Sequence, residues 1–249
     1  MNRRNFLKAS IASSVAAAAG LWSTAYLGAA NRGKSFSDAA VKLTPPAEGK
    51  IPVAVAITED AQVIDFAGPW EVFQDVMLKD GPHDEGMDHR MPFDLYTVAE
   101  TKDPVTGSGG LKILPDYTFA NAPAPKIVVV PAQTGSDALH AWLKKVAADP
   151  QTDLVTSVCT GAFQLAKAGL LNGKPATTHH LAQERLKKDF PSIDVKTGLR
   201  FVESGRIDTA GGLTSGIDMA LRIVDRYYGR SIAQQTADFM EYQSKGWMV

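Results

Sequence analysis

Short apolar runs alternate with amphipathic segments along most of this chain. Runs rich in β-branched residues and bounded by polar or glycine-containing segments predict strands that are buried on both faces. Such runs lie at 51–58, 93–100, 126–132 and 152–158, and a shorter one lies at 174–180. Weaker alternation with glycine turns predicts a hairpin or irregular excursion over 105–119 and further strands over 192–212.

Apolar residues recur at helical spacing in the segments that follow these runs. We expect the first helix to begin near Pro69, since proline suits a first helical turn, and to be closed by Gly81. Ser136 is placed to cap the next helix, and another helix begins near Gly161 and ends around Gly169. The remaining predicted helices lie near 181–186, 214–228 and 230–244.

The alternation of short buried strands with helices predicts an α/β sandwich built on a mainly parallel sheet. In such sheets, binding sites gather at the carboxyl ends of the strands. Three chemically capable residues lie close to predicted strand ends: Asp65 after the first run, Cys159 after the 152–158 run, and His179 near the end of the 174–180 run. These residues are therefore the first candidates for a functional site.

The first thirty residues differ from the rest of the chain. Arg3 and Arg4 precede an apolar stretch from about residue 11 to 26, and small residues end the segment near Ala30. A paired arginine, a modest apolar core and a small-residue end are typical of a twin-arginine export signal. A membrane anchor is the alternative, but the apolar core is short for a span and rich in Ala and Ser. Residues 31–50 are polar and read as a linker, so the predicted folded domain is 51–249.

Composition narrows the function classes. The chain has 249 residues, of which 45% are hydrophobic and 21% charged, as in a globular protein with a sizeable core. Without the three basic residues of the signal, 23 Lys and Arg remain against 27 Asp and Glu, a net charge near −4. No basic stripe remains, so we expect no nucleic-acid partner. Membrane contact is expected only through the signal during export.

Cys159 is the only cysteine, in a chain expected to reach the oxidising cell envelope. It cannot form an internal disulfide, so it is either deeply buried or used. Small residues, Ser157 and Gly161, flank it where a predicted strand turns into a helix, which is the pattern of a nucleophile elbow with Cys in place of Ser. The helix start is expected to favour the thiolate and to lower the pKa of the thiol. The alternative is an inert core cysteine beside an ordinary helix start.

Four stretches of the chain resemble the ThiJ/PfpI superfamily. They are TSVCTGAFQLAKAGLLNGKPATTHH (156–180), QVIDFAGPWEVF (62–73), KIVVVPAQTG (126–135) and TAGGLTSGIDMALRIV (209–224). The resemblance is greatest to the branch that contains isonitrile hydratase and the ligand-binding half of certain AraC-type regulators, and it covers roughly 51–244. It implies a flavodoxin-like α/β sandwich with a cysteine elbow.

The resemblance also implies residue roles. Cys159 would be the nucleophile, Asp65 its acidic partner, and Thr160 would assist through its hydroxyl or backbone N–H. Ala132, Gln133, Gly161 and His179 would line the substrate pocket or anion hole. The implied activity is hydration of small electrophiles such as isonitriles to N-formamides, with no cofactor and no metal, in a protein that is commonly a homodimer.

Several departures from the branch affect this interpretation. Ala132-Gln133 stand where the branch usually has Gly-Gly, so the anion pocket is altered if that turn needs positive φ. His180 replaces a common Trp, and the 81–92 loop is longer. A further departure is the export signal, because the known hydratase type is cytoplasmic.

Two other functions stay open. One is a non-catalytic module of the same fold that binds small molecules or senses redox state. The other is glyoxalase- or deglycase-like chemistry on reactive carbonyls, which usually pairs Cys with Glu rather than with an Asp such as Asp65. The His and acidic residues of 83–89 have no regular metal-site spacing, and we expect a solvated loop there.

Overall fold

The computed structural model describes residues 34–38, 40–79 and 90–249. The predicted export signal at 1–30, and the His- and acid-rich part of the 81–92 loop, lie outside the described residues. Within the described ranges, no helix is both long enough and apolar enough to span a bilayer.

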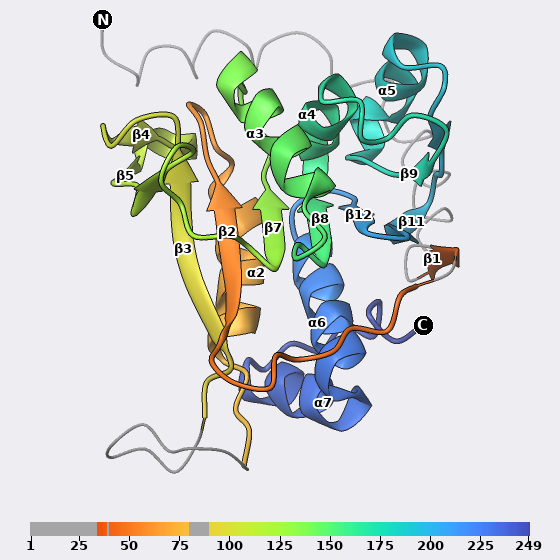
Figure 1. Cartoon of the computed structure of the whole chain (residues 1–249). Coiled ribbons are helices and arrows are strands. Elements are labelled where there is room, and N and C mark those ends of the chain that lie inside the picture. Colours follow the sequence, from red (N-terminus) through yellow and green to blue (C-terminus); the bar gives the residue numbers. More distant parts are fainter. Residues whose placement is uncertain (1–33, 39, 80–89) are drawn as a thin grey trace, which may run out of the picture. The chain divides into compact units, whose positions relative to one another are not determined.

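The core of the fold is one eight-stranded sheet (Figure 1). Its strands, in spatial order, are β1 (Lys34–Asp38), β11 (Leu199–Ser204), β12 (Ile207–Ala210), β8 (Leu154–Ser157), β7 (Ile127–Val130), β2 (Ile51–Ala56), β3 (Phe93–Ala99) and β6 (Tyr117–Thr118). Every neighbouring pair is parallel except the β11–β12 hairpin. The mainly parallel sheet predicted from the hydrophobic runs is thus confirmed.

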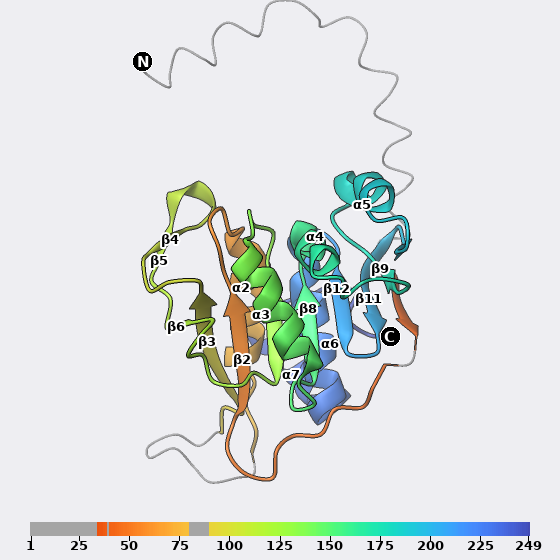
Figure 2. The same ribbon diagram turned by 45° about the horizontal axis from the view of Figure 1, so that its top comes forward.

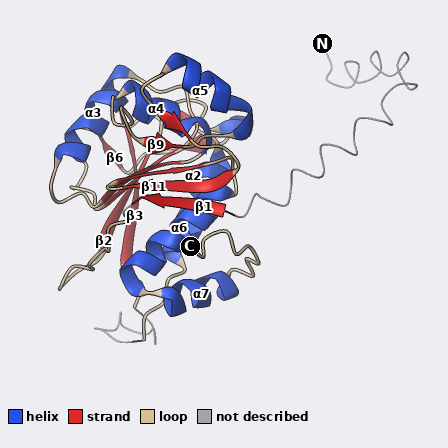
Figure 3. Cartoon of the chain, turned by 90° about the vertical axis from the view of Figure 1, so that its right-hand side faces the viewer, coloured by secondary structure: helices blue, strands red, loops and turns tan. Residues whose placement is uncertain are grey.

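Helices cover both faces of this sheet, which Figure 3 shows nearly edge-on. One layer contains α2 (Val63–Gln74), α6 (Ser215–Tyr228) and α7 (Arg230–Phe239). The other contains α3 (Asp137–Ala148), α4 (Ala162–Lys167) and α5 (Gln183–Asp189), and lies nearer the viewer in Figure 2. Successive residues of β2 belong to opposite cores: Val53 and Val55 pack in the α2–α6 core, whereas Ala54 and Ala56 pack in the α3–α4 core. Burial on both faces explains why these strands are apolar without alternation.

Short elements complete the chain. They are the β4–β5 hairpin (Val105–Thr106 and Lys112–Ile113), the parallel β9–β10 pair (Pro175–Ala176 and Asp194–Val195), and the 3₁₀ turns η3 (Ser108–Gly110), η4 (Cys159–Gly161) and η5 (His180–Ala182). The predicted excursion over 105–119 is therefore a hairpin followed by β6. Ser136 caps α3 as predicted, accepting the N–H of Leu139 at 3.1 Å.

Two predicted boundaries are wrong. Helix α2 begins at Val63 and holds Pro69 in its interior, instead of beginning near Pro69, and it ends at Gln74 rather than at Gly81. Because proline has no N–H, the carbonyl of Asp65 lacks its usual i+4 donor. Part of the predicted 31–50 linker is also ordered: Lys34–Asp38 forms β1 and pairs with β11, whose outer edge would otherwise be unpaired.

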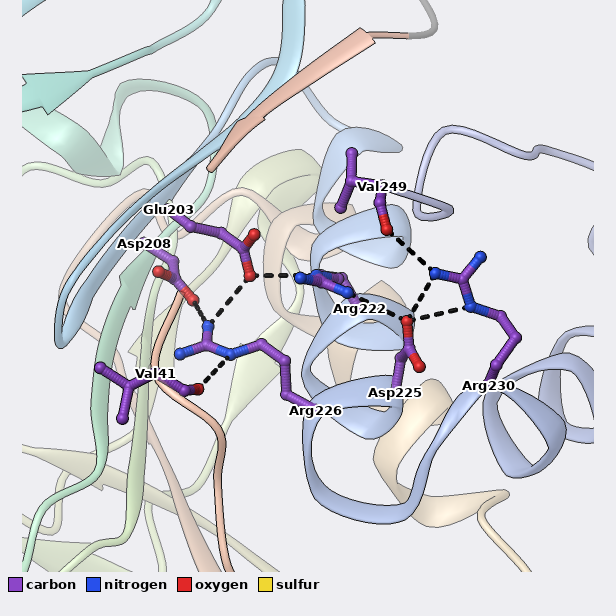
Figure 4. Close-up of polar contacts among 8 residues, drawn as sticks. All are labelled: Val41, Glu203, Asp208, Arg222, Asp225, Arg226, Arg230 and Val249. Atoms are coloured by element: carbon purple, nitrogen blue, oxygen red, sulfur yellow. Dashed lines mark hydrogen bonds and ion pairs between the residues drawn. The ribbon is translucent and has the colours of Figure 1, made fainter. Parts of the chain in front are cut away.

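A buried ion-pair network fixes this end of the sheet to α6 (Figure 4). Nη1 of Arg226 donates to Asp208 at 2.7 Å and to Glu203 at 3.2 Å. Nε of Arg226 donates to the carbonyl of Val41 at 3.0 Å, which holds the segment after β1 against the domain. The network extends through Arg222, Asp225, Arg230 and Val249.

Candidate active site

Cys159 lies on a sharp turn between β8 and α4. Its φ is +59°, a left-handed conformation that an L residue adopts at some energetic cost and that is typical of functional turns. Two hydrogen bonds hold the turn: the N–H of Cys159 donates to the carbonyl of Gly211 at 2.7 Å, and Oγ1 of Thr178 donates to the carbonyl of Cys159 at 2.7 Å. The segments that follow β12 and β9 therefore position the nucleophile candidate.

Gly161 makes this turn possible. A Cβ atom at this position would lie 2.2 Å from the carbonyl oxygen of Val130 and 2.8 Å from that of Pro131. Because both obstacles are backbone atoms, no side-chain movement relieves the clash. The small residue that the elbow pattern requires is thus explained by the close packing of η4 on the end of β7.

Asp65 lies in the first turn of α2 and is 0% exposed. Its Oδ2 accepts the N–H of Ala132 at 3.1 Å, whereas its Oδ1 has no hydrogen-bond partner among the described residues. Burial raises the pKa of Asp65 to about 7, against smaller opposing effects from the Ala132 N–H and the Cys159 thiol. A buried carboxylate oxygen without a partner is uncommon in folded proteins and marks a position where a proton or a ligand is expected.

The prediction of a lowered pKa for Cys159 is wrong. The side chain is 8% exposed, and burial, reinforced by the charge of Asp65, raises the pKa of the thiol to about 11. Hydrogen bonds from the backbone N–H groups of Thr160 and Leu213 lower the pKa of the thiol, but by less than burial and Asp65 raise it. The thiol therefore keeps its proton at neutral pH while the neighbouring carboxyl is close to half ionised.

Such a pair can transfer a proton at the moment of attack. A carboxylate with a pKa near neutrality is a competent general base, and its conjugate acid is a competent general acid. Thr160, directly after the nucleophile, contributes a backbone N–H to the sulfur. The arrangement is suited to adding sulfur and hydrogen across an electrophilic carbon without a preformed thiolate.

The departure at Ala132-Gln133 does not disturb the turn. Neither residue has positive φ, and the N–H of Ala132 supports Asp65 directly. The side chain of Gln133 bonds to the backbone at and just after the end of β2. Its Oε1 accepts the N–H of Thr58 at 2.5 Å, and its Nε2 donates to the carbonyl of Ala56 at 3.1 Å. Gln133 thus holds its turn through its side chain, while its backbone remains beside the elbow.

His179 is near the elbow but is not bonded to Cys159 or Asp65 in the contacts of the described residues. Its Nδ1 accepts a hydrogen bond from the N–H of Leu181 at 3.3 Å. Its ring packs closely on Gly212: a Cβ atom at Gly212 would lie only 2.3 Å from Cδ2 of His179. Burial, with a smaller contribution from His180, lowers its pKa, which favours the neutral imidazole. Its neighbour Thr178, rather than His179 itself, bonds to the elbow.

Sequence reasoning missed three residues of the site. They are Thr178, Gly211 and Leu213, the last with φ +52°. The Thr-Thr-His segment and the Gly-Gly-Leu segment had been noted for their resemblance, but nothing in them indicates which backbone group meets the sulfur. In the part of the chain that the structure describes, no group of three or more His, Cys, Asp or Glu is placed to hold a metal ion.

Comparison with known proteins gives the family of this fold. A DJ-1/PfpI family model matches residues 52–226. The chain belongs to the DJ-1/PfpI family. It is 35% identical over 187 residues to the isonitrile hydratase of Pseudomonas putida, across 73% of this chain and 74% of that protein. It is 31% identical over 152 residues to the HTH-type transcriptional regulator GbdR of Pseudomonas aeruginosa, across 59% of this chain and 41% of the regulator.

A solved structure shows the same fold. The ThiJ/PfpI family protein from Pseudomonas syringae superposes with a TM-score of 0.65 at 28% identity, covering 80% of this chain and 77% of that one. The predicted flavodoxin-like sandwich with its cysteine elbow is confirmed. The family includes both enzymes and regulators, so the activity depends on the chemistry of this site.

Proposed function

We propose that this protein is a hydratase that uses Cys159 to add water to isonitriles and related small electrophiles, giving N-formamides. The observation that carries the proposal is the unpartnered Oδ1 of the buried Asp65, beside a protonated thiol. The resemblance to the Pseudomonas putida isonitrile hydratase supports the choice of electrophile.

The first half-reaction adds the thiol to the substrate. Asp65 accepts the proton of Cys159 as the sulfur bonds to the terminal carbon of R–N≡C. The protonated carboxyl then gives that proton to the same carbon, which leaves a thioimidate, R–N=CH–S, on Cys159. A base with a pKa near 7 both accepts and returns the proton at neutral pH.

The second half-reaction consumes one water molecule. Asp65 takes a proton from water as the water oxygen adds to the thioimidate carbon. Asp65 then passes that proton to the nitrogen. The carbon–sulfur bond then breaks, the hydroxyl proton returns to sulfur, and R–NH–CHO leaves. Cys159 and Asp65 end in their starting protonation states, so no cofactor or oxidant is consumed.

A second candidate function has one observation in its favour. The pKa of Cys159, about 11, leaves little thiolate for unassisted attack at neutral pH, which suits a pocket that binds small molecules without turning them over. GbdR shows that relatives of this domain occur in regulators.

The decisive experiment compares turnover by the unaltered protein, Cys159→Ser and Asp65→Asn. Purified protein is incubated with cyclohexyl isocyanide, and in parallel with methylglyoxal, and N-formamide or lactate is quantified. Formamide production lost in both variants supports the hydratase, whereas lactate production would replace it with glyoxalase-like chemistry. Saturable binding of the isonitrile without formamide would leave the binding module.

Export and assembly belong to the same proposal. We infer a twin-arginine signal at 1–30, a cell-envelope location and a homodimer. An Arg3→Lys/Arg4→Lys variant in the expressing bacterium should leave the protein in the cytoplasm, and sedimentation equilibrium of the purified domain should give twice the chain mass. Unimpaired export of that variant would contradict the signal.

A further inference from the structure

A cavity of about 210 Å³ lies directly beside the cysteine elbow. Its lining residues come from the end of β7, from η4 and α4, and from the α5 region, and they are Gln133, Thr134, Thr160, Phe163, Gln164, Lys167, Ala182 and Arg185. Two of them, Gln133 and Thr160, belong to the candidate active site. Thr160 follows Cys159 in the chain, so the cavity lining includes the nucleophile's neighbour, although Cys159 and Asp65 are not themselves lining residues.

The cavity is cationic. Lys167 and Arg185 are the charged members of its lining, and no acidic residue lines it. Lys167 is solvent-exposed and has no ion-pair partner in the contacts of the described residues. The guanidinium of Arg185 lies 5.1 Å from the ring centre of Phe163 and uses Nε to bind Asp189 at 3.2 Å, which leaves its Nη groups facing no described acceptor. Arg and Lys placed together beside a small pocket are suited to a carboxylate.

One wall of the cavity is preorganised. Gln164 is 3% exposed, its Nε2 donates to the carbonyl of Gln133 at 2.9 Å, and its Oε1 is 2.8 Å from Nε2 of His140. A Cβ at Gly135 would lie 2.1 Å from that Oε1, so glycine is needed for this packing. The amide has its own partners and is not a ligand-binding group. Charge selection in the cavity therefore depends on Lys167 and Arg185.

A neighbouring cavity has the opposite charge. It measures about 290 Å³ and lies at the carboxyl ends of β2 and β3, where Glu59, Glu100 and Asp103 line it. An anionic ligand would be repelled from that cavity and attracted to the one beside Thr160. The two cavities therefore differ in charge, although Thr134 lines both of them.

We propose that the substrate of Cys159 carries a carboxylate group, which Lys167 and Arg185 hold in the 210 Å³ cavity while its electrophilic carbon reaches the sulfur. This inference rests on the proposed function in that Cys159 must be reactive, but it does not require that the electrophile be an isonitrile. It identifies the substrate as a small acid rather than a neutral molecule.

The test uses two alkylating agents of nearly equal size, anionic iodoacetate and neutral iodoacetamide. Cys159 is the only thiol, so mass spectrometry of the intact protein reports its rate with each agent. We expect the iodoacetate-to-iodoacetamide rate ratio to fall about 5-fold in Lys167→Ala/Arg185→Ala at low ionic strength, and by less than about 2-fold in 0.5 M NaCl, because salt screens exposed charges. Lys188→Ala, on the same helix as Arg185 but outside the cavity lining, is the control and should keep the original ratio.

Each outcome decides between the two claims. An equal ratio in the double variant and the unaltered protein at low salt overturns the carboxylate subsite. Turnover then tests the reaction: isocyanoacetate should have a higher kcat/KM than its methyl ester, and the double variant should reduce or abolish that preference. A fallen alkylation ratio with no formamide from either compound would keep the subsite and remove the hydratase. Formamide from both compounds without preference, together with an unchanged alkylation ratio, would keep the hydratase and remove the carboxylate subsite.

Discussion

The carboxyl group of Asp65, on α2, interacts with the thiol of Cys159, at the start of η4, and each changes the protonation of the other. The charge of Asp65 raises the pKa of the thiol, and the thiol lowers that of the carboxyl against the larger effect of burial. The protonation state of each group therefore depends on that of the other. These pKa values favour a protonated thiol beside a carboxyl group that titrates near neutral pH, as the proposed mechanism requires.

Asp65→Asn is expected to lower the pKa of Cys159 from about 11, because it removes the negative charge that disfavours the thiolate. Alkylation by iodoacetamide at pH 8 should become faster, while formamide production is lost with the base. The measurement is the alkylation rate between pH 6 and pH 11. Asp137→Asn, at a fully exposed carboxyl of α3, is the control and should leave the profile in place. Slower alkylation of Asp65→Asn would mean that the carboxyl activates the thiol in the resting protein.

The raised pKa of Asp65 also predicts a stability effect. The group has a pKa of 3.8 when unperturbed and about 7 in the folded protein, so the folded state binds the proton more tightly than the unfolded state. Its contribution to stability is full below pH 3.8 and is lost as the pH rises to about 7. Asp65→Asn removes this loss, and its free energy of unfolding should exceed that of the unaltered protein by on the order of 2 kcal/mol at pH 8.

Urea denaturation of both proteins at pH 4.5 and pH 8 measures the effect. The difference between variant and unaltered protein should widen with pH, and other titrating groups cancel in that difference. A variant that is less stable at pH 8 would show that the carboxylate contributes to folding. A wider gap at pH 8 would show that the buried charge of Asp65 costs stability, which is expected of a group kept for the proposed reaction.

The sequence was sufficient to predict the architecture and to select Asp65 and Cys159, whose side chains the structure brings together. Short β-branched runs with no alternation indicated strands buried on both faces, and the positions of Asp65 and Cys159 after two such strands indicated one edge of the sheet. These inferences depend on local pattern and on the general geometry of parallel sheets.

The protonation of the site was not predictable from the sequence. The start of a helix beside Cys159 suggested a lowered pKa for the thiol, but that effect is local. The pKa is raised instead by the burial of Cys159 and by the charge of Asp65, which lies on a helix more than ninety positions earlier in the chain. Similarly, Lys34–Asp38 looked like a linker because the residues of β11 that pair with it are remote in sequence. Long-range packing overrides local signals in both cases.

Gly161→Ala tests the geometry of the elbow. The added Cβ would meet backbone oxygen at 2.2 Å, so we expect a loss of roughly 3 kcal/mol or more of stability, above the usual cost of overpacking. Gly212→Ala is the matched comparison, because its Cβ would meet the side chain of His179 at 2.3 Å. That side chain is partly exposed and can change its rotamer, whereas backbone cannot, so the loss of stability should be smaller, and adding His179→Ala should restore the stability. Thermal or urea denaturation of the four proteins decides the order, and an equal loss at both glycines would contradict the explanation.

Arg226→Met tests the buried network of Figure 4. The substitution leaves Asp208 without its only described partner and removes one of two arginines from Glu203, at sites that are 1% and 0% exposed. Removing one partner of a buried ion pair costs about 3–5 kcal/mol, so a loss of that size in the free energy of unfolding is expected. Arg230→Met, at the exposed end of the same network, should cost less than about 1 kcal/mol.

The same substitution should release the N-terminal segment, because Nε of Arg226 also holds the carbonyl of Val41. Limited proteolysis should then cut near residue 41 faster in Arg226→Met than in Arg230→Met. Adding Asp208→Asn to Arg226→Met removes the carboxylate that is left without a partner and should recover part of the lost stability, while leaving the rapid cleavage near residue 41. If stability and resistance to cleavage near residue 41 both recover, the Val41 contact depends on the charge balance. If neither recovers, Arg226 stabilises the domain mainly by filling space.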